Sequence, residues 1–258
     1  MARMSRRFFL LCSAALPLGC ATRGGGVAQS AASAPAVRQP ATGQSWHYAK
    51  HDLYTHALID DQIDTVATVG QTVEIDSRTE AGQSATAPKA TWGTSWLRKY
   101  LPHHDKPPGG PLPDEVQDPW GKVLVDPHWG QVQVYETPIP LWPPQLTPGW
   151  HTYINTKYKT PNHEVDGLPW SQTMKAEEWE TVNVPAGRYR ALRFINRIDF
   201  RSTDFSHTAA QRQEKIWFAP EVGRWVARES SGSFYIEDSS VDTPYDEPGY
   251  RWELLEWS

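Results

Sequence analysis

The sequence predicts a mainly β protein with antiparallel, curved sheets, half-barrel or sandwich-like in arrangement, and at most one or two short helices. Three observations support this prediction. Trp, Tyr, Val and Thr recur at alternating positions, which favours strands. The chain contains 22 prolines, and proline excludes long helices. Short apolar runs also end repeatedly at Pro and Gly, as strands joined by turns do.

The first 19 residues are predicted to be an export signal that is not part of the fold. Arg3, Arg6 and Arg7 form a basic start, and the apolar run from Phe8 to Gly19 follows. A membrane-spanning helix needs about 20 apolar residues, so this run indicates a targeting segment. The string SRRFFL, which contains Arg6 and Arg7, resembles the twin-arginine export signal. An ordinary secretory peptide with paired arginines is the alternative.

Cys20 is predicted to be a lipidation site. The chain has two cysteines, Cys12 and Cys20, and both lie in or next to the signal. LPLGC resembles a bacterial lipoprotein cleavage box, although Pro17 and Leu18 depart from its usual pattern. We therefore expect an acyl anchor at Cys20 and a place in the bacterial envelope, facing the periplasm, on the outer membrane. The alternative is a soluble periplasmic protein, released by cleavage between Ala28 and Ala34 at small-x-small sequences.

The charge of the mature chain argues against nucleic-acid binding. Removal of residues 1–19 takes away three arginines and no acidic residue, which leaves 22 basic and 30 acidic residues and a net charge near −8. Nucleic acids and anionic membranes both bind basic surfaces, so an acidic chain is a poor candidate for either.

Residues 20–43 are rich in Gly, Ala, Ser, Pro and Gln, and they are predicted to form a flexible tether.

Residues 44–138 are predicted to be a β-rich N-terminal half with a proline-rich connection. Strands are expected at Ser45–Tyr48, Gln62–Thr68 and Gln71–Ile75. A short helix is expected over 91–101, where Trp92, Trp96, Leu97, Tyr100 and Leu101 share one helical face before Pro102. Residues 102–148 contain twelve prolines, so this stretch is read as a long extended connection. Two strand-like islands interrupt it at 122–125 and 131–136.

Residues 139–258 are predicted to form a domain of β-hairpins. The first hairpin joins 179–184 to 188–200 through Pro185-Ala186-Gly187, with Gly187 in a left-handed position. On its second strand, Leu192, Phe194, Ile198 and Phe200 are expected on one face, interrupted by Asn196, with Arg193, Arg197 and Asp199 on the other. A second hairpin joins 215–218 to 224–228, and a final strand covers 250–257.

These hairpins carry a resemblance to a known family. ETVNVPAGRYRALRF, then IWFAPEVGRWVARES and a final RWELLEWS resemble a family of uncharacterised bacterial periplasmic proteins and lipoproteins, in which a V-P-A-G-x-[FY]-x-A hairpin precedes a W-[YF]-A-P-x-x-G-R-x-V hairpin. PLWPPQLTPGW resembles the segment that precedes them. The resemblance covers about residues 139–258. It implies an antiparallel, curved sheet similar to periplasmic lipoprotein-carrier half-barrels, and it supplies no catalytic residues.

The sequence contains no established catalytic or cofactor motif, and no cofactor is expected. It lacks a G-x-S-x-G elbow, a G-x-G-x-x-G loop, a P-loop and an H-E-x-x-H pair. His47, His51 and Asp52 are the candidate metal ligands, which would suit a periplasmic metal-dependent hydrolase. The simpler interpretation is that both histidines lie on a solvated strand face.

Tryptophan is the other candidate binding residue type. Trp46, Trp150, Trp217 and Trp225 are candidates for lining an apolar ligand site or stacking on sugars, and packing of a small β core is the alternative. We expect a lipid-anchored envelope protein with a non-catalytic binding or structural role, whose partner is an apolar ligand or an envelope protein. A metal-dependent hydrolase and a glycan- or peptidoglycan-binding module are the alternatives.

Overall fold

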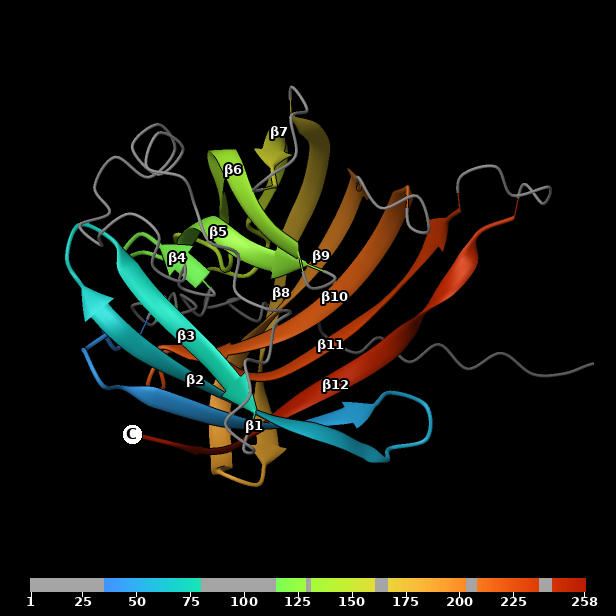
Figure 1. Cartoon of the computed structure of the whole chain (residues 1–258). Coiled ribbons are helices and arrows are strands. Elements are labelled where there is room, and N and C mark those ends of the chain that lie inside the picture. Colours follow the sequence, from blue (N-terminus) through green and yellow to red (C-terminus); the bar gives the residue numbers. More distant parts are fainter. Residues whose placement is uncertain (1–34, 80–114, 129–130, 161–166, 203–207, 237–242) are drawn as a thin grey trace, which may run out of the picture. The chain divides into compact units, whose positions relative to one another are not determined.

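Twelve antiparallel strands close into one barrel in the computed structural model (Figure 1). It describes residues 35–79, 115–128, 131–160, 167–202, 208–236 and 243–258. The strands are β1 Ser45–Asp52, β2 Leu58–Val69, β3 Val73–Thr79, β4 Glu115–Gln117, β5 Lys122–His128, β6 Gln131–Pro140, β7 His151–Lys159, β8 Leu168–Val184, β9 Gly187–Arg201, β10 Ala209–Ala219, β11 Arg224–Tyr235 and β12 Tyr245–Trp257.

Each strand pairs with its neighbour in the chain, and the first strand pairs with the last. β1 and β12 run antiparallel from the Trp46–Trp257 pair to the Asp52–Tyr250 pair. This pairing closes the barrel, and closure removes the free sheet edges on which other chains can add. The expected mainly β, antiparallel fold is confirmed, and the structure adds the closure that the sequence pattern left open.

The two predicted C-terminal hairpins are present, with their turns at the expected residues. Val184 pairs with Gly187, so Pro185 and Ala186 form the turn, and Gly187 has a φ of 139°. In the second hairpin Ala219 pairs with Arg224, and Gly223 has a φ of 72°. A positive φ costs glycine little, which explains why glycine ends both turns.

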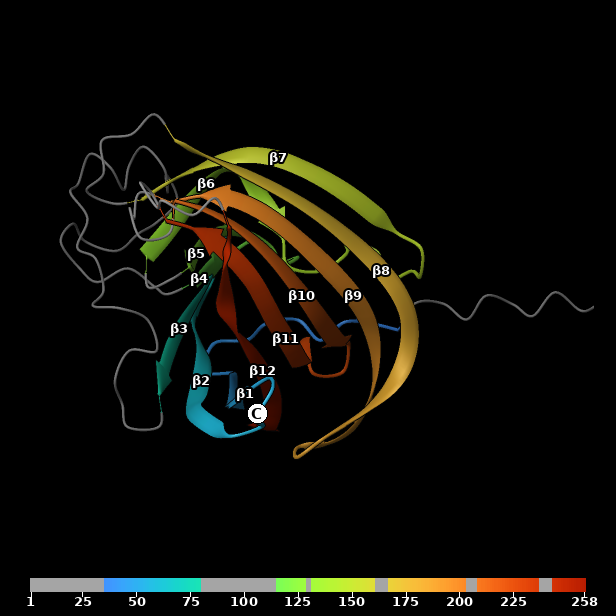
Figure 2. The ribbon, with the colours of Figure 1, turned by 90° about the vertical axis from the view of Figure 1, so that its right-hand side faces the viewer.

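β8 and β9 are the longest strands, and they curve strongly around one side of the barrel (Figure 2). A register shift between Ala176 and Trp179 marks a bulge in β8. Such bulges bend a strand and increase its twist. The tip of this hairpin contacts the end of β12, where the Ala186 amide donates to the Leu254 carbonyl at 3.0 Å.

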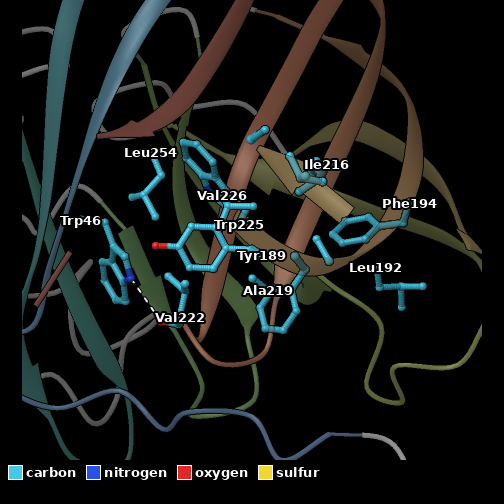
Figure 3. Packing of buried hydrophobic residues seen from close by; sticks show 14 of the residues in the cluster. Trp46, Tyr189, Leu192, Phe194, Ile216, Ala219, Val222, Trp225, Val226 and Leu254 are labelled. Atoms are coloured by element: carbon cyan, nitrogen blue, oxygen red, sulfur yellow. Dashed lines mark hydrogen bonds between the residues drawn. The ribbon is translucent and has the colours of Figure 1, made fainter. Parts of the chain in front are cut away.

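Large apolar side chains pack tightly in the main core cluster (Figure 3). Trp46 Nε1 donates to the Val222 carbonyl at 3.3 Å, and the ring of Tyr48 stacks on Trp225 with centroids 3.7 Å apart. A second cluster surrounds Trp170, whose ring contacts Tyr135, Tyr158 and Phe200.

Several sequence predictions concern residues outside the described ranges. The predicted signal, the predicted lipidation site Cys20 and the predicted helix over 91–101 all lie there. The expected boundary between 138 and 139 lies within β6, and strands from both sides of it share the one sheet. Among the described residues, no helix has the length and apolarity needed to cross a membrane.

Candidate functional site

Arg224 is the centre of a buried ion-pair network inside the barrel. Its guanidinium donates to Asp64 Oδ2 at 3.0 Å and to Glu115 Oε2 at 3.1 Å. β11 carries the arginine, whereas the carboxylates come from β2 and β4, which are not its neighbours in the sheet. These ion pairs therefore cross the interior. Asp64 is also bound by the Ser77 hydroxyl and the Gln62 amide.

Burial and charge set the pKa values in this network. Burial alone would lower the pKa of Arg224, but the negative charges of Glu115 and Asp64 outweigh that effect and raise it. Burial raises the pKa of Glu115, although Arg224 opposes the shift. Burial likewise raises the pKa of Tyr48, whose hydroxyl donates to the Trp225 carbonyl at 3.0 Å. Arg224 therefore stays charged, and Tyr48 stays neutral at physiological pH.

A second interior network runs across β11, β10, β9 and β8. Arg228 donates to Glu214 at 2.5 Å, and Asn196 donates to the other oxygen of the same carboxylate at 3.4 Å. The amide nitrogen of Gln172 donates to Asn196 Oδ1 and to the Pro140 carbonyl. The amide oxygen of Gln172 accepts a hydrogen bond from Trp170 Nε1. Buried polar groups that bind one another in this way rigidify and specify a core.

The cavities that the described residues enclose around these networks are small. One of about 30 Å³ lies between Trp170, Trp225 and Arg228, and another of about 50 Å³ lies beside Trp46 and Arg224. A water molecule takes about 30 Å³ in the liquid, whereas ligand sites have about 300–1,000 Å³. These cavities suit one or two water molecules, and neither holds an organic ligand.

The outer face of the same strands carries charges that are paired. Arg193 contacts Glu177 at 2.7 Å, Glu178 at 2.9 Å and Glu180 at 3.3 Å. The hydrogen bond from Arg193 to Glu177 is the main reason that the pKa of Arg193 rises. On β10 to β12, Glu229 pairs with both Lys215 and Arg251. The charged side chains named here are therefore paired with one another.

Further along these strands, the outer face forms an open hollow of about 490 Å³. We call it the polar hollow. Its polar side chains stand opposite one another across β9 to β12, in one row of Asp199, Gln211, Ser233 and Asp246 and a second row of Arg197, Gln213 and Ser231. These positions alternate with inward residues such as Ile198 and Glu214, so they face outward. No hydrogen bond or ion pair within the described part of the chain occupies any of these seven side chains.

Tyr54 stands at the rim of the polar hollow, with 72% of its surface exposed. Asp52 holds the turn that presents it, because Asp52 Oδ1 accepts from the Tyr54 amide at 3.0 Å and the Thr55 amide at 2.7 Å. The Thr55 hydroxyl donates to the same oxygen at 2.9 Å. The hydrogen bonds from Thr55 and then Tyr54 lower the pKa of Asp52. Gly249 leaves room for the ring, since a Cβ there would lie 3.0 Å from Tyr54 Cε2.

The three candidate metal ligands have separate surroundings. His47 lies between Asp61 at 3.7 Å and Glu256 at 3.6 Å, His51 lies 3.3 Å from the His56 carbonyl, and Asp52 caps its turn. Four residues along a strand span about 13 Å, too far for His47 and His51 to bind one ion at about 2 Å each. Within the described ranges, no three His, Cys, Asp or Glu side chains are grouped to hold a metal.

The four candidate tryptophans belong to the core or pack against it. Trp46 and Trp225 are 2% and 6% exposed, and Trp150 and Trp217 are partly buried against the main cluster. Trp217 Nε1 also donates to Glu180 at 2.5 Å. Packing therefore accounts for all four positions.

Sequence reasoning missed the residues of the polar hollow. Strand alternation in the sequence predicts that Arg197 and Asp199 lie on the face opposite the core, and the structure places them there. The polar stretches of β10 and β11 showed the same alternation, with Gln211 and Gln213 facing Ser233 and Ser231. The approach of Tyr54 had no local signal, because it depends on how β1 pairs with β12.

Comparison with known proteins gives a limited result. No protein-family profile matches the sequence, and no curated protein is significantly similar to it. Among solved structures, a protein described as exported, with a YmcC-like fold, from Bacteroides fragilis has 11% identity and a TM-score of 0.48, over 87% of this chain and 100% of the other. A protein described as a lipoprotein from Parabacteroides distasonis has 12% identity and a TM-score of 0.45, over 84% of this chain and 96% of the other.

Proposed function

We propose that this chain is an exported, lipid-anchored binding protein of the bacterial envelope that has no catalytic role. The anchor is Cys20, reached through the export signal that contains Arg6 and Arg7, and the anchored chain faces the periplasm. The folded barrel binds its partner on its outer surface, at the polar hollow.

One observation carries this proposal, the contrast between the interior of the barrel and its outer face. Ion pairs and aromatic rings occupy the described interior, where the two cavities have about 50 and 30 Å³. The polar hollow has about 490 Å³ and seven side chains without a partner in the described part of the chain. The volume falls within the range of about 300–1,000 Å³ found for ligand sites, and the free polar groups are available to bind a ligand.

The same contrast favours one of the occupants that the sequence left open. An apolar ligand needs an apolar cavity, and the two interior cavities beside Trp46 and Trp170, of about 50 and 30 Å³, are too small for one. The polar hollow instead suits a polar partner. A metal-dependent hydrolase finds no support in the positions of His47, His51 and Asp52.

Lipidation is tested by growing cells that express the full chain with labelled palmitate. We expect label on the wild-type chain and its recovery with outer membranes, and we expect Cys20→Ser to remove both. Cys12→Ser is the matched control, because Cys12 lies inside the predicted signal. A soluble, unlabelled wild-type chain would instead support cleavage between Ala28 and Ala34.

Binding at the polar hollow is tested by cosedimentation of the purified mature chain with isolated cell envelopes. Ser231→Arg and Ser233→Arg place long charged side chains in the hollow, and we expect each to weaken cosedimentation. Thr181→Arg, on an exposed position of β8 outside the hollow, is the control and should bind as the wild type does. Equal binding by all variants would contradict the proposed site.

A further inference from the structure

We infer that the polar hollow binds a neutral oligosaccharide. This inference rests on the proposed function, which places binding at the hollow, and it adds the chemical class of the ligand. Four features of the described residues support it: the polar groups of the hollow, its contrast with the adjacent surface, its charge and the aromatic ring at its rim.

The side chains of the hollow match the chemistry of sugar hydroxyls. A hydroxyl both donates and accepts hydrogen bonds, so a surface that recognises several of them needs donors and acceptors side by side. Gln211 and Gln213 each supply both through one planar amide, and Ser231 and Ser233 stand directly across from them on β11. Neighbouring strands lie about 4.8 Å apart, so a row across four strands extends about 14 Å, which suits a short oligosaccharide.

The arginine next to the hollow is paired, whereas the arginine inside it is not. Arg193 and Arg197 lie on the same face of β9, four residues apart. Arg193 contacts three glutamates, whereas no residue in the described part of the chain forms an ion pair or a hydrogen bond with the Arg197 side chain. Next to the hollow, the protein pairs Arg193 with its own carboxylates, whereas in the hollow Arg197 is left for a ligand.

The charge of the hollow argues against a polyanion, and the closed sheet argues against an added peptide strand. Its free charged groups are one arginine, Arg197, and two aspartates, Asp199 and Asp246. A nucleic acid or another polyanion requires a basic surface, which this is not. An extended peptide that adds to a sheet requires a free edge, and the strands described here form a closed barrel.

Tyr54 supplies the aromatic surface that a sugar ring needs. One face of a pyranose ring consists of C–H groups, and these pack on the electron-rich face of an aromatic ring. The ring of Tyr54 is exposed at the rim of the hollow, and the turn that carries it is fixed by three hydrogen bonds to Asp52. The backbone that carries the ring is therefore held in place before the ligand arrives, which lowers the entropy cost of binding.

Calorimetry of the purified mature chain tests the inference with a panel of neutral oligosaccharides: chitohexaose, maltohexaose, cellohexaose and mannohexaose. We expect at least one to bind, and we expect Tyr54→Ala to weaken that binding about tenfold. Gln213→Ala should weaken it as well. Tyr153→Ala is the matched control, since Tyr153 is 65% exposed on β7 outside the hollow, and it should bind as the wild type does. Binding by no member of the panel, or equal binding by all variants, would overturn the inference.

A photo-crosslinking amino acid in place of Gln213 separates this inference from the proposed function. In living cells, a crosslinked product that glycosidases shorten supports the saccharide. A product with a protein or a lipid overturns the saccharide but leaves binding at the hollow intact. The same amino acid in place of Tyr153 is the control. If the Gln213 position gives no crosslinked product that this control lacks, both the saccharide and binding at the hollow are overturned.

Discussion

Arg224 shows how a charged residue can serve as a core residue in a small barrel. Its guanidinium lies between Asp64 and Glu115, and 3% of the residue is exposed. Each partner comes from a different strand, so the arginine ties together parts of the sheet that do not pair directly. The benefit of such a network depends on all of its members being present.

Replacement of Arg224 is expected to be strongly destabilising. Arg224→Met leaves two carboxylates buried without their cation, and we expect the free energy of unfolding to fall by about 3–5 kcal/mol. Urea unfolding followed by tryptophan fluorescence measures this change. Arg251→Met is the control, because Arg251 pairs near the surface, and it should cost about 1 kcal/mol or less. Similar losses for the two variants would show that the buried network has no special role.

Gly232 is the residue that allows β10, β11 and β12 to approach beneath the hollow. A Cβ at this position would lie 2.4 Å from the Gln211 carbonyl oxygen and 2.8 Å from Glu247 Oε2. We expect Gly232→Ala to lower the free energy of unfolding by about 1–3 kcal/mol, because the backbone has to move. Gly70→Ala is the matched control, with its nearest contact at 3.9 Å. Thermal unfolding of both variants is the measurement, and equal stability would contradict the predicted clash.

The turn between β1 and β2 is predicted to depend on the charge of Asp52. Hydrogen bonds hold its folded pKa below the ordinary value of 3.8. Their stabilising contribution is therefore complete above pH 3.8 and is lost as the pH falls through the folded pKa. Hydrogen exchange of the Tyr54 and Thr55 amides should accelerate, relative to other exposed turns, only in that acidic range.

Asp52→Asn distinguishes the charge from the hydrogen bonds. Asparagine keeps an acceptor oxygen but does not titrate, so its turn should show no acid-dependent opening. An identical acid response in the wild type and Asp52→Asn would show that another group controls the turn.

The elements differ in how far the sequence predicted them. Both C-terminal hairpins were predicted, since Pro185, Gly187, Pro220 and Gly223 encode their turns locally, and alternation assigned the faces of β9 correctly. Closure of the barrel was not predicted, because the pairing of β1 with β12 joins residues some 200 positions apart. The same limit applies to the polar hollow, where Tyr54 reaches β9 to β12 only through that pairing.

For the whole barrel, the closing strand is expected to determine stability. Leu254 on β12 is fully buried in the main cluster, beside the β1–β12 pairing. We expect Leu254→Ala to lower the free energy of unfolding by about 2–5 kcal/mol. Leu58→Ala is the control, because Leu58 is 62% exposed on β2, and its effect should be small. Urea titration measures both, and a small effect at Leu254 would show that the closing strand contributes little.

The central claim is that this barrel binds on its outer face and keeps a filled interior. Hydrogen–deuterium exchange of the mature chain, with and without the oligosaccharide that binds in calorimetry, tests this claim most directly. We expect the ligand to slow exchange at 53–57, 209–213 and 231–235, which surround the polar hollow. Exchange in β4, β5 and β6, which carry no residue of the hollow, should be unchanged. Slower exchange confined to β4, β5 and β6, or no change at the hollow, would contradict the account.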